Sequence, residues 1–150
     1  VGADRICNAV AGYELYGGPL VIVDFGTATT FDVVDEKGNY LGGAIMPGLE
    51  TSTAELFKKA ARLFKVGLRF PETVIGQTTE TSIQAGIMYG AIDSVDGMVR
   101  RIWRELGQEC KVIATGGLAP VIVKKSETVS ETVPFLVLKG LYRIYRQVRG

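Results

Sequence analysis

The chain has 150 residues, enough for one ordinary domain, and its hydrophobic content of 47% is sufficient to build a buried core. Its 17 basic and 16 acidic side chains leave a formal net charge of +1, which argues against a nucleic-acid or anionic membrane surface as partner. Histidine is absent, which excludes catalytic triads and metal sites that depend on imidazole. A general base must therefore be a carboxylate, Lys, Tyr or a water molecule.

The two cysteines, Cys7 and Cys110, stand in neither a CxxC pair nor a Cys/His cluster. A disulfide framework and a zinc site are therefore not expected, and a reducing cytoplasm is the expected location. The sequence also contains no apolar run of about 18 residues and no signal-peptide pattern. We therefore expect neither a transmembrane span nor secretion.

The N-terminal part of the sequence predicts a helix followed by three strands. Residues 4–15 carry apolar side chains at helical spacing, and Asp4 would lie at the positive end of the helix dipole. The side chains expected on the buried face of this helix are Ile6, Ala9, Val10 and Tyr13. The glycines and proline at 17–19 end the helix. The strands of the expected antiparallel meander, with the turn "DEKGN" before the third, cover residues 20–23, 30–34 and 40–45.

The middle of the sequence predicts two further helices. The pattern SxxE at Ser52–Glu55 is typical of a capping box and predicts a helix that runs to about Leu63. Residues 66–75 predict a loop with a short extended piece, and 79–106 predict a long helix. The glycines at 86 and 90 lie four residues apart on that helix, so another helix could pack closely there.

The C-terminal part predicts a strand at 111–114, a helix to about Lys125, a short edge strand near Thr132 and a final helix over 135–148. The whole chain is therefore expected to be one α/β lobe of the ribonuclease-H-like type. In this lobe a three-stranded antiparallel meander is extended by parallel strands, with helices on both faces.

The segment "VIVDFGTATTFDVV" at 21–34 combines an apolar strand with a polar bend. Gly26 allows a close turn, and the hydroxyls of Thr27, Thr29 and Thr30 lie beside backbone N–H groups that can bind phosphate oxygens. A carboxylate at Asp24 beside phosphate requires a cation between the two. An ordinary polar β-turn explains the same residues equally well.

Two other segments carry chemistry. "TGG" at 115–117 could place a nucleotide at a helix N-terminus, or could serve only helix–strand packing. In "GADR", Asp4 could accept a proton from a hydroxyl during phosphoryl transfer, and Arg5 could bind a substrate carboxylate. The alternative for Asp4 is a helix cap.

Together these motifs resemble the type III pantothenate kinases, members of the acetate and sugar kinase, Hsp70 and actin superfamily. The resemblance runs almost from end to end and keeps the order of the family's motifs. The motifs are "GADR" (2–5), "NAVAGYELYGGP" (8–19), "VDFGTATTFDVV" (23–34), "GNYLGGAIMPG" (38–48), "VIGQTT" (74–79), "QAGIMYG" (84–90), "VIATGGLAP" (112–120) and "LKGL" (138–141).

The resemblance implies an activity: ATP phosphorylates the terminal hydroxyl of pantothenate, the first step of coenzyme A synthesis. It implies Asp4 as general base, pantothenate contacts from Gly2, Ala3, Asp4, Arg5 and Thr79, and Asp24 as ligand of a monovalent cation, K+ or NH4+. It further implies Mg2+ with ATP, a phosphate contact from Thr27 beside Gly26, and Gly116 and Gly117 on the adenosine side. Members of the family are dimers whose pantothenate pocket borders the partner chain.

Family members also have an N-terminal lobe of similar fold that begins with a DxGNT phosphate loop, and this sequence contains no such motif. We therefore expect residues 1–150 to be the C-terminal lobe of such a kinase, inactive or very weak without the other lobe, which would supply the second wall of the ATP site. The alternatives are an isolated half-domain that folds and self-associates without catalysis, and a regulatory family member.

Overall fold

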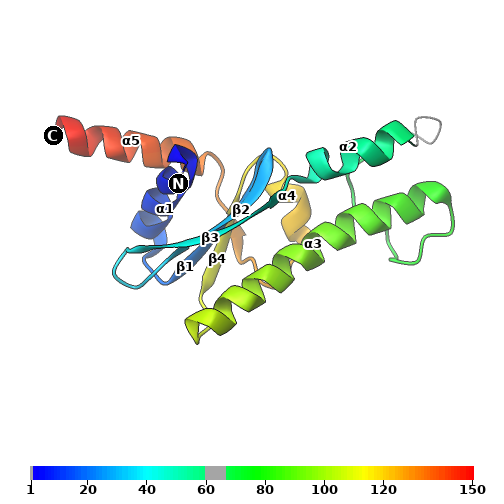
Figure 1. Ribbon diagram of the computed structural model, residues 1–150, viewed down its shortest axis with the longest axis horizontal. Helices are drawn as coiled ribbons and strands as arrows, with labels where there is room; N and C mark the ends of the chain where they lie inside the picture. Colours follow the sequence, from blue (N-terminus) through cyan, green and yellow to red (C-terminus); the bar gives the residue numbers. More distant parts are fainter. Residues whose placement is uncertain (1, 60–66) are drawn as a thin grey trace.

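The computed structural model describes residues 2–59 and 67–150 and contains a five-stranded mixed sheet between two layers of helices (Figure 1). The strands are β1 (Leu20–Phe25), β2 (Ala28–Val34), β3 (Tyr40–Pro47), β4 (Lys111–Thr115) and β5 (Glu131–Thr132). The helices are α1 (Ala3–Tyr16), α2 (Leu49–Lys59), α3 (Thr79–Leu106), α4 (Ala119–Ile122) and α5 (Leu136–Arg149), with a 3-10 turn at Val123–Lys125.

The strand order is β3-β2-β1-β4-β5, with β1, β2 and β3 antiparallel and β4 and β5 parallel to β1. The predicted meander with its parallel extension is therefore confirmed. The apolar run at the start of β1 is buried along its whole length because helices cover both of its faces.

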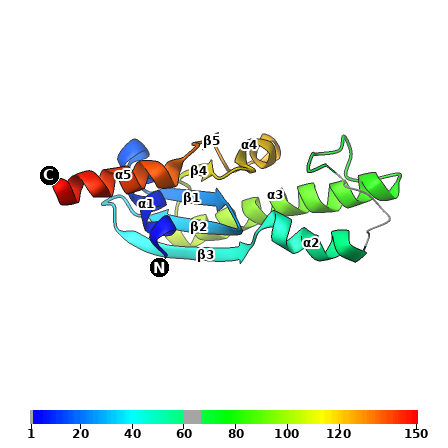
Figure 2. The ribbon, with the colours of Figure 1, turned by 90° about the horizontal axis from the view of Figure 1, so that it is seen from above.

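Alternation along the strands divides the core into two parts. On one face Val23 and Phe31 pack against α3 and α4, and on the other Ile22 and Val34 pack against α1 and α5. Figure 2 shows α1 and α5 side by side on their face of the sheet, with α3 along the other. In residues 2–59 and 67–150 no helix has both the length and the apolarity to cross a membrane.

The predicted buried face of α1 is correct only in part: Ala9 is buried, Val10 and Tyr13 are partly buried, and Ile6 is exposed. The buried side chains of this helix are small, namely Cys7, Asn8, Ala9, Ala11 and Gly12. A Cβ on Gly12 would lie 2.9 Å from side-chain atoms of both Leu20 and Ile22, so the helix lies directly on the sheet. Close packing selects small residues here, and Ile6 is left exposed.

The predicted capping box at Ser52–Glu55 is wrong. The helix begins three residues earlier, at Leu49, and the Ser52 hydroxyl donates a hydrogen bond of 3.1 Å to the Leu49 carbonyl inside it. A reciprocal box instead precedes α3, where the Thr78 hydroxyl accepts from the Thr81 amide at 3.1 Å and the Thr81 hydroxyl accepts from the Thr78 amide at 3.0 Å. The Thr81 hydroxyl, at the third helical position, therefore accepts the hydrogen bond from the N-cap amide that a Glu or Gln side chain usually accepts there.

The remaining boundaries need smaller corrections. The helix predicted to end at Lys125 is the short α4 followed by the 3-10 turn. Residues 67–78 contain no strand, so the extended piece predicted there is absent from the described part of the loop. The predicted end of the helix at Leu63 lies outside the described residues.

Candidate functional site

The bend after β1 is a tight hairpin turn made by Gly26 and Thr27, both exposed, with a hydrogen bond of 3.1 Å from the Gly26 amide to the Ala28 carbonyl. Alternation along β2 sends its two threonines to opposite faces of the sheet. Thr29 is buried on the α3 face, so its hydroxyl does not serve the bend as expected, whereas Thr30 lies on the same face as Asp24.

The second glycine turn lies directly beside this bend. β4 runs parallel to β1 with Thr115 paired to Asp24, so both strands end at the same edge of the sheet. Gly116 has a φ of 101°, and a Cβ there would lie 2.5 Å from the Phe25 carbonyl oxygen. A side chain would prevent this close approach. The predicted ATP residues Gly26, Thr27, Gly116 and Gly117 are thus brought together where α/β sheets commonly bind ligands.

The first turn of α1 carries Asp4 and Arg5. Asp4 is exposed, whereas Arg5 lies against the sheet with its Nε donating to Asp32 Oδ1 at 2.7 Å and its Nη2 donating to the Phe31 carbonyl at 3.3 Å. A guanidinium has more N–H donors than these two contacts use. Arg5 is therefore anchored along one edge and keeps donors for a second anion.

The carboxylate that anchors Arg5 is fully buried. Asp32 Oδ1 also accepts a hydrogen bond of 2.6 Å from the Tyr40 hydroxyl. Burial raises the pKa of Asp32, and the contacts with Tyr40 and Arg5 oppose that shift. Burial and the adjacent Asp32 carboxylate raise the pKa of Tyr40 to about 12. Tyr40 therefore acts as a neutral donor.

Asn8 connects α1 to the bend. It is fully buried one helical turn after Asp4, and its Nδ2 donates to Asp24 Oδ2 at 2.8 Å. The other carboxylate oxygen, Asp24 Oδ1, lies 3.6 Å from the position that a Cβ on Gly26 would take, so it faces the bend. This single hydrogen bond ties the helix of Asp4 to the strand end that carries the predicted cation ligand.

The residues around Asp24 fit a cation. Asp24 forms no ion pair with another described residue, and Asn8 Oδ1 has no hydrogen-bond partner in the described part of the chain. A buried unsatisfied acceptor costs about 1–3 kcal/mol. A cation would be attracted to the Asp24 carboxylate, whose Oδ1 faces the bend. Across residues 2–59 and 67–150, no three His, Cys, Asp or Glu side chains form a group suited to a metal ion.

Thr79 lies apart from these residues. It is exposed at the start of α3, while the N-terminus of α1 lies toward the opposite end of the molecule in both views (Figure 1, Figure 2). The chain by itself therefore does not bring Thr79 to Asp4.

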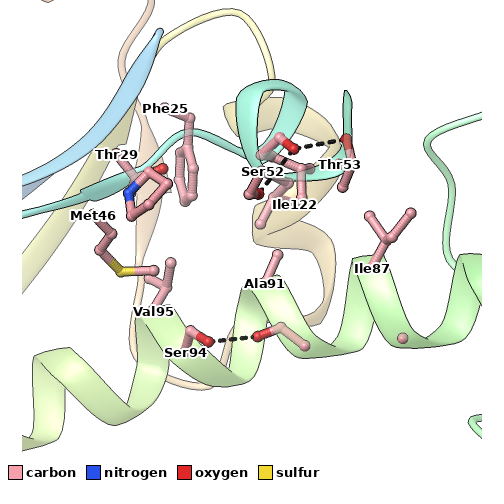
Figure 3. A pocket seen from close by; sticks show the side chains of 14 residues that line it. Phe25, Thr29, Met46, Ser52, Thr53, Ile87, Ala91, Ser94, Val95 and Ile122 are labelled. Carbon is pink, nitrogen blue, oxygen red and sulfur yellow. Dashed lines mark hydrogen bonds between the residues drawn. The ribbon is translucent and has the colours of Figure 1, made fainter. Parts of the chain in front are cut away.

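A cavity of about 240 Å³ lies on the α3 face, between the end of the sheet, α2 and α3 (Figure 3). Gly86 and Gly90 line it, and a Cβ on either would meet nothing within 4 Å. The close helix packing predicted for these glycines is therefore not seen among the described residues. Phe25, Met46 and Val95 point into the same space, whereas Asp24 lies on the other face of the sheet.

Asn8, Asp32 and Tyr40 were not predicted as site residues. One signal was present: Asp32 interrupts an apolar strand at a position that alternation places on the same face as Asp24. A buried carboxylate needs a partner, and Arg5 was already a candidate. The local sequence around Asn8 and Tyr40 carries no comparable signal.

Comparison with known proteins shows which solved structures the chain resembles. The chain resembles, at 23% identity and a TM-score of 0.69, a solved structure described as a conserved Baf family transcriptional activator from Campylobacter jejuni. The alignment covers 99% of this chain but only 65% of that protein, so the chain spans less than two thirds of its length.

Two further structures share the fold. The activator of 2-hydroxyisocaproyl-CoA dehydratase from Clostridium difficile, solved with bound ADPNP, matches with a TM-score of 0.54 at 13% identity, over 97% of this chain and 67% of that one. The ethanolamine utilization protein EutJ from Carboxydothermus hydrogenoformans matches with a TM-score of 0.56 at 16% identity, over 91% of this chain and 52% of that one. These likenesses show that the chain shares the fold of the three solved structures.

The model of one protein family matches residues 1–101, about two thirds of the chain, and its description is type III pantothenate kinase. The matched region contains both Asp4 and Asp24 and the hydrogen bond between α1 and the bend. The chain therefore belongs to the type III pantothenate kinase family.

Proposed function

We propose that this chain is the pantothenate-binding lobe of a cytoplasmic kinase that converts pantothenate and ATP to 4'-phosphopantothenate and ADP, the first step of coenzyme A synthesis. The observation that carries the proposal is the hydrogen bond from Asn8 to Asp24. It holds the helix whose first turn carries the exposed Asp4 against the strand end that leads into the proposed phosphate-binding bend. Family membership supplies the class of reaction.

Asp4 is the proposed general base. Its exposed carboxylate would accept the proton of the terminal pantothenate hydroxyl while the hydroxyl oxygen bonds to the γ-phosphorus of ATP and ADP leaves. Gly2 and Ala3 would line the pantothenate site. The donors of Arg5 that Asp32 does not use would bind the pantothenate carboxylate.

The phosphates of ATP would lie at the edge formed by Gly26, Thr27, Gly116 and Gly117. Asp24 would hold K+ or NH4+ there, and Mg2+ bound to ATP would neutralise charge on the transferred phosphoryl group. The Clostridium difficile structure with bound ADPNP supports nucleotide use by a lobe of this fold. An N-terminal lobe, as in the family, would supply the opposite wall.

A homodimer is part of the proposal. Thr79 lies too far along α3 to reach a substrate beside Asp4 of its own chain, so a contact from Thr79 would come from the partner subunit. Exposed apolar side chains along α5 support self-association. They are Leu138, Leu141, Tyr142, Tyr145 and Val148.

The proposal is tested by measuring ADP release with pantothenate as acceptor, using this chain alone and together with the N-terminal lobe of a family member. We expect turnover only with both lobes, dependence on K+ or NH4+, and none with glucose as acceptor. Turnover by this chain alone would contradict the proposal that the ATP site requires an N-terminal lobe.

The same preparations test the second candidate, a half-domain that self-associates without catalysis, which the exposed face of α5 favours. A dimeric mass in light scattering, combined with no turnover in either preparation, would support that candidate and contradict the kinase proposal.

A further inference from the structure

We infer that Asn8 is a positioning residue, which orients the Asp24 carboxylate so that one oxygen is fixed to α1 and the other is presented to the bend. The inference rests on the proposed cation site at Asp24. The proposed function uses the Asn8–Asp24 hydrogen bond only to hold α1 against the end of β1, and the inference adds that the same bond orients the Asp24 carboxylate for the cation.

The contacts of Asp24 divide its two oxygens. Oδ2 accepts the hydrogen bond of 2.8 Å from Asn8 Nδ2, and Oδ1 lies on the side of Gly26. Without the amide, the carboxylate could rotate about its terminal torsion, because that rotation has only a broad preference. β1 sets the position of the Asp24 carboxylate at the end of the strand. The hydrogen bond from Asn8 then holds that carboxylate in one orientation.

Asn8 also sets the distance between the base and the cation site. Asp4 and Asn8 are four residues apart on α1, hence on the same side of the helix one turn apart. A second tie, from Arg5 to Asp32, holds the same turns of the helix to β2. Two hydrogen bonds to two neighbouring strands therefore restrict both sliding and rotation of the N-terminus of α1.

The surroundings of Asn8 argue against a role in stability alone. Its side chain is fully buried, yet its Oδ1 finds no partner in the described part of the chain. Its buried neighbours on the helix, Cys7 and Ala9, are small and apolar. A residue chosen only for packing would resemble them, since an unpaired buried acceptor lowers stability.

The test uses the 150-residue chain and thermal unfolding in K+ or NH4+ chloride, with tetramethylammonium chloride added to keep the ionic strength constant. Asn8→Leu removes the donor and the unpaired oxygen together, so the variant is expected to fold. Cys7→Ala is the control at the adjacent buried position, and Asp24→Asn defines complete loss of the cation response.

We expect K+ or NH4+ to raise the unfolding temperature of the wild type. The cation concentration that gives half of the maximal increase should be at least tenfold higher for Asn8→Leu. Cys7→Ala should respond like the wild type. A wild-type cation response in Asn8→Leu would overturn the inference and leave the cation site standing. No cation response in the wild type would overturn the inference and the cation site together, while the phosphorylation assay would still test the kinase proposal.

Discussion

Arg5, Asp32 and Tyr40 form a small buried network in which one oxygen of Asp32 accepts from both neighbours. Burial makes the ionised form of Asp32 costly, and the positive charge of Arg5 and the hydroxyl of Tyr40 offset part of that cost. The network leaves Arg5 in one orientation above β2. Under the proposed function, this fixed orientation would let Arg5 offer its remaining donors to the pantothenate carboxylate at a lower entropic cost.

Tyr40→Phe is expected to destabilise the fold by about 1–2 kcal/mol at neutral pH, because Asp32 loses a hydrogen bond. The pKa of Tyr40 is about 12 in the folded chain, above the usual value of about 10 for an unfolded tyrosine. The Tyr40 hydroxyl therefore makes its full contribution to the free energy of unfolding below about pH 10, and this contribution is lost as the pH rises toward 12.

Urea unfolding at pH 8 and at pH 11 measures this difference. The gap in stability between wild type and Tyr40→Phe should narrow at the higher pH. Tyr142→Phe, at an exposed position on α5, controls for tyrosine ionisation in general. A gap of the same size at both pH values would contradict the assignment of Tyr40 as a neutral donor to Asp32.

Local sequence can predict a candidate site residue only where that residue and its neighbours along the chain form a recognisable pattern. Asp24 and Gly26 lie in a strand and bend with a recognisable pattern, and Asp4 lies in the first turn of a helix. Asn8 and Asp32 act through partners 16 and 27 residues away in the sequence. Their roles depend on the register between α1 and the sheet, which no local pattern determines.

At the scale of elements, α1 is held between the sheet and α5. A Cβ on Gly140 would lie 2.0 Å from the Cys7 carbonyl oxygen, so α5 crosses α1 in direct backbone contact. An ion pair of 2.8 Å between Arg143 and Glu14 joins the same two helices at the surface. Exposed ion pairs contribute little, so the close crossing is the main constraint.

Gly140→Ala should therefore destabilise the chain by about 1–3 kcal/mol through overpacking, despite the better helix propensity of alanine. Gly90→Ala is the matched control, because a Cβ there meets nothing within 4 Å. It should be neutral or stabilising by up to about 1 kcal/mol. Chemical unfolding of both variants checks the pair, and equal effects would contradict the described crossing of α1 and α5.

Sequence periodicity was sufficient for the sheet and for α3 because their apolar patterns are long and regular. It failed in part for the buried face of α1, where close contact with the sheet selects small residues over large apolar ones. It also failed for the start of α2, since SxxE describes a cap only when the chain is not already helical. The error at α1 arises from tertiary contacts that override a local pattern, whereas the error at α2 arises because the helix begins before Ser52.

At the scale of the whole molecule, the candidate groups divide between two regions. Asp4, Arg5, Asp24 and the two glycine turns gather around the end of β1, while Thr79 stands at the far end of α3. This division is consistent with a site completed by other polypeptide segments, an N-terminal lobe for ATP and a partner subunit for pantothenate. Under the proposed function, the lone chain would offer one wall of such a site.

The central claim is that Asp4 takes the hydroxyl proton of pantothenate, and the most direct measurement is the turnover of Asp4→Asn in the two-lobe preparation. Asparagine keeps the size of the side chain but cannot accept the proton, so we expect a loss of about 10²–10⁴-fold in kcat. Asp93→Asn, at an exposed position on α3, should keep wild-type turnover. Wild-type turnover in Asp4→Asn would contradict the account.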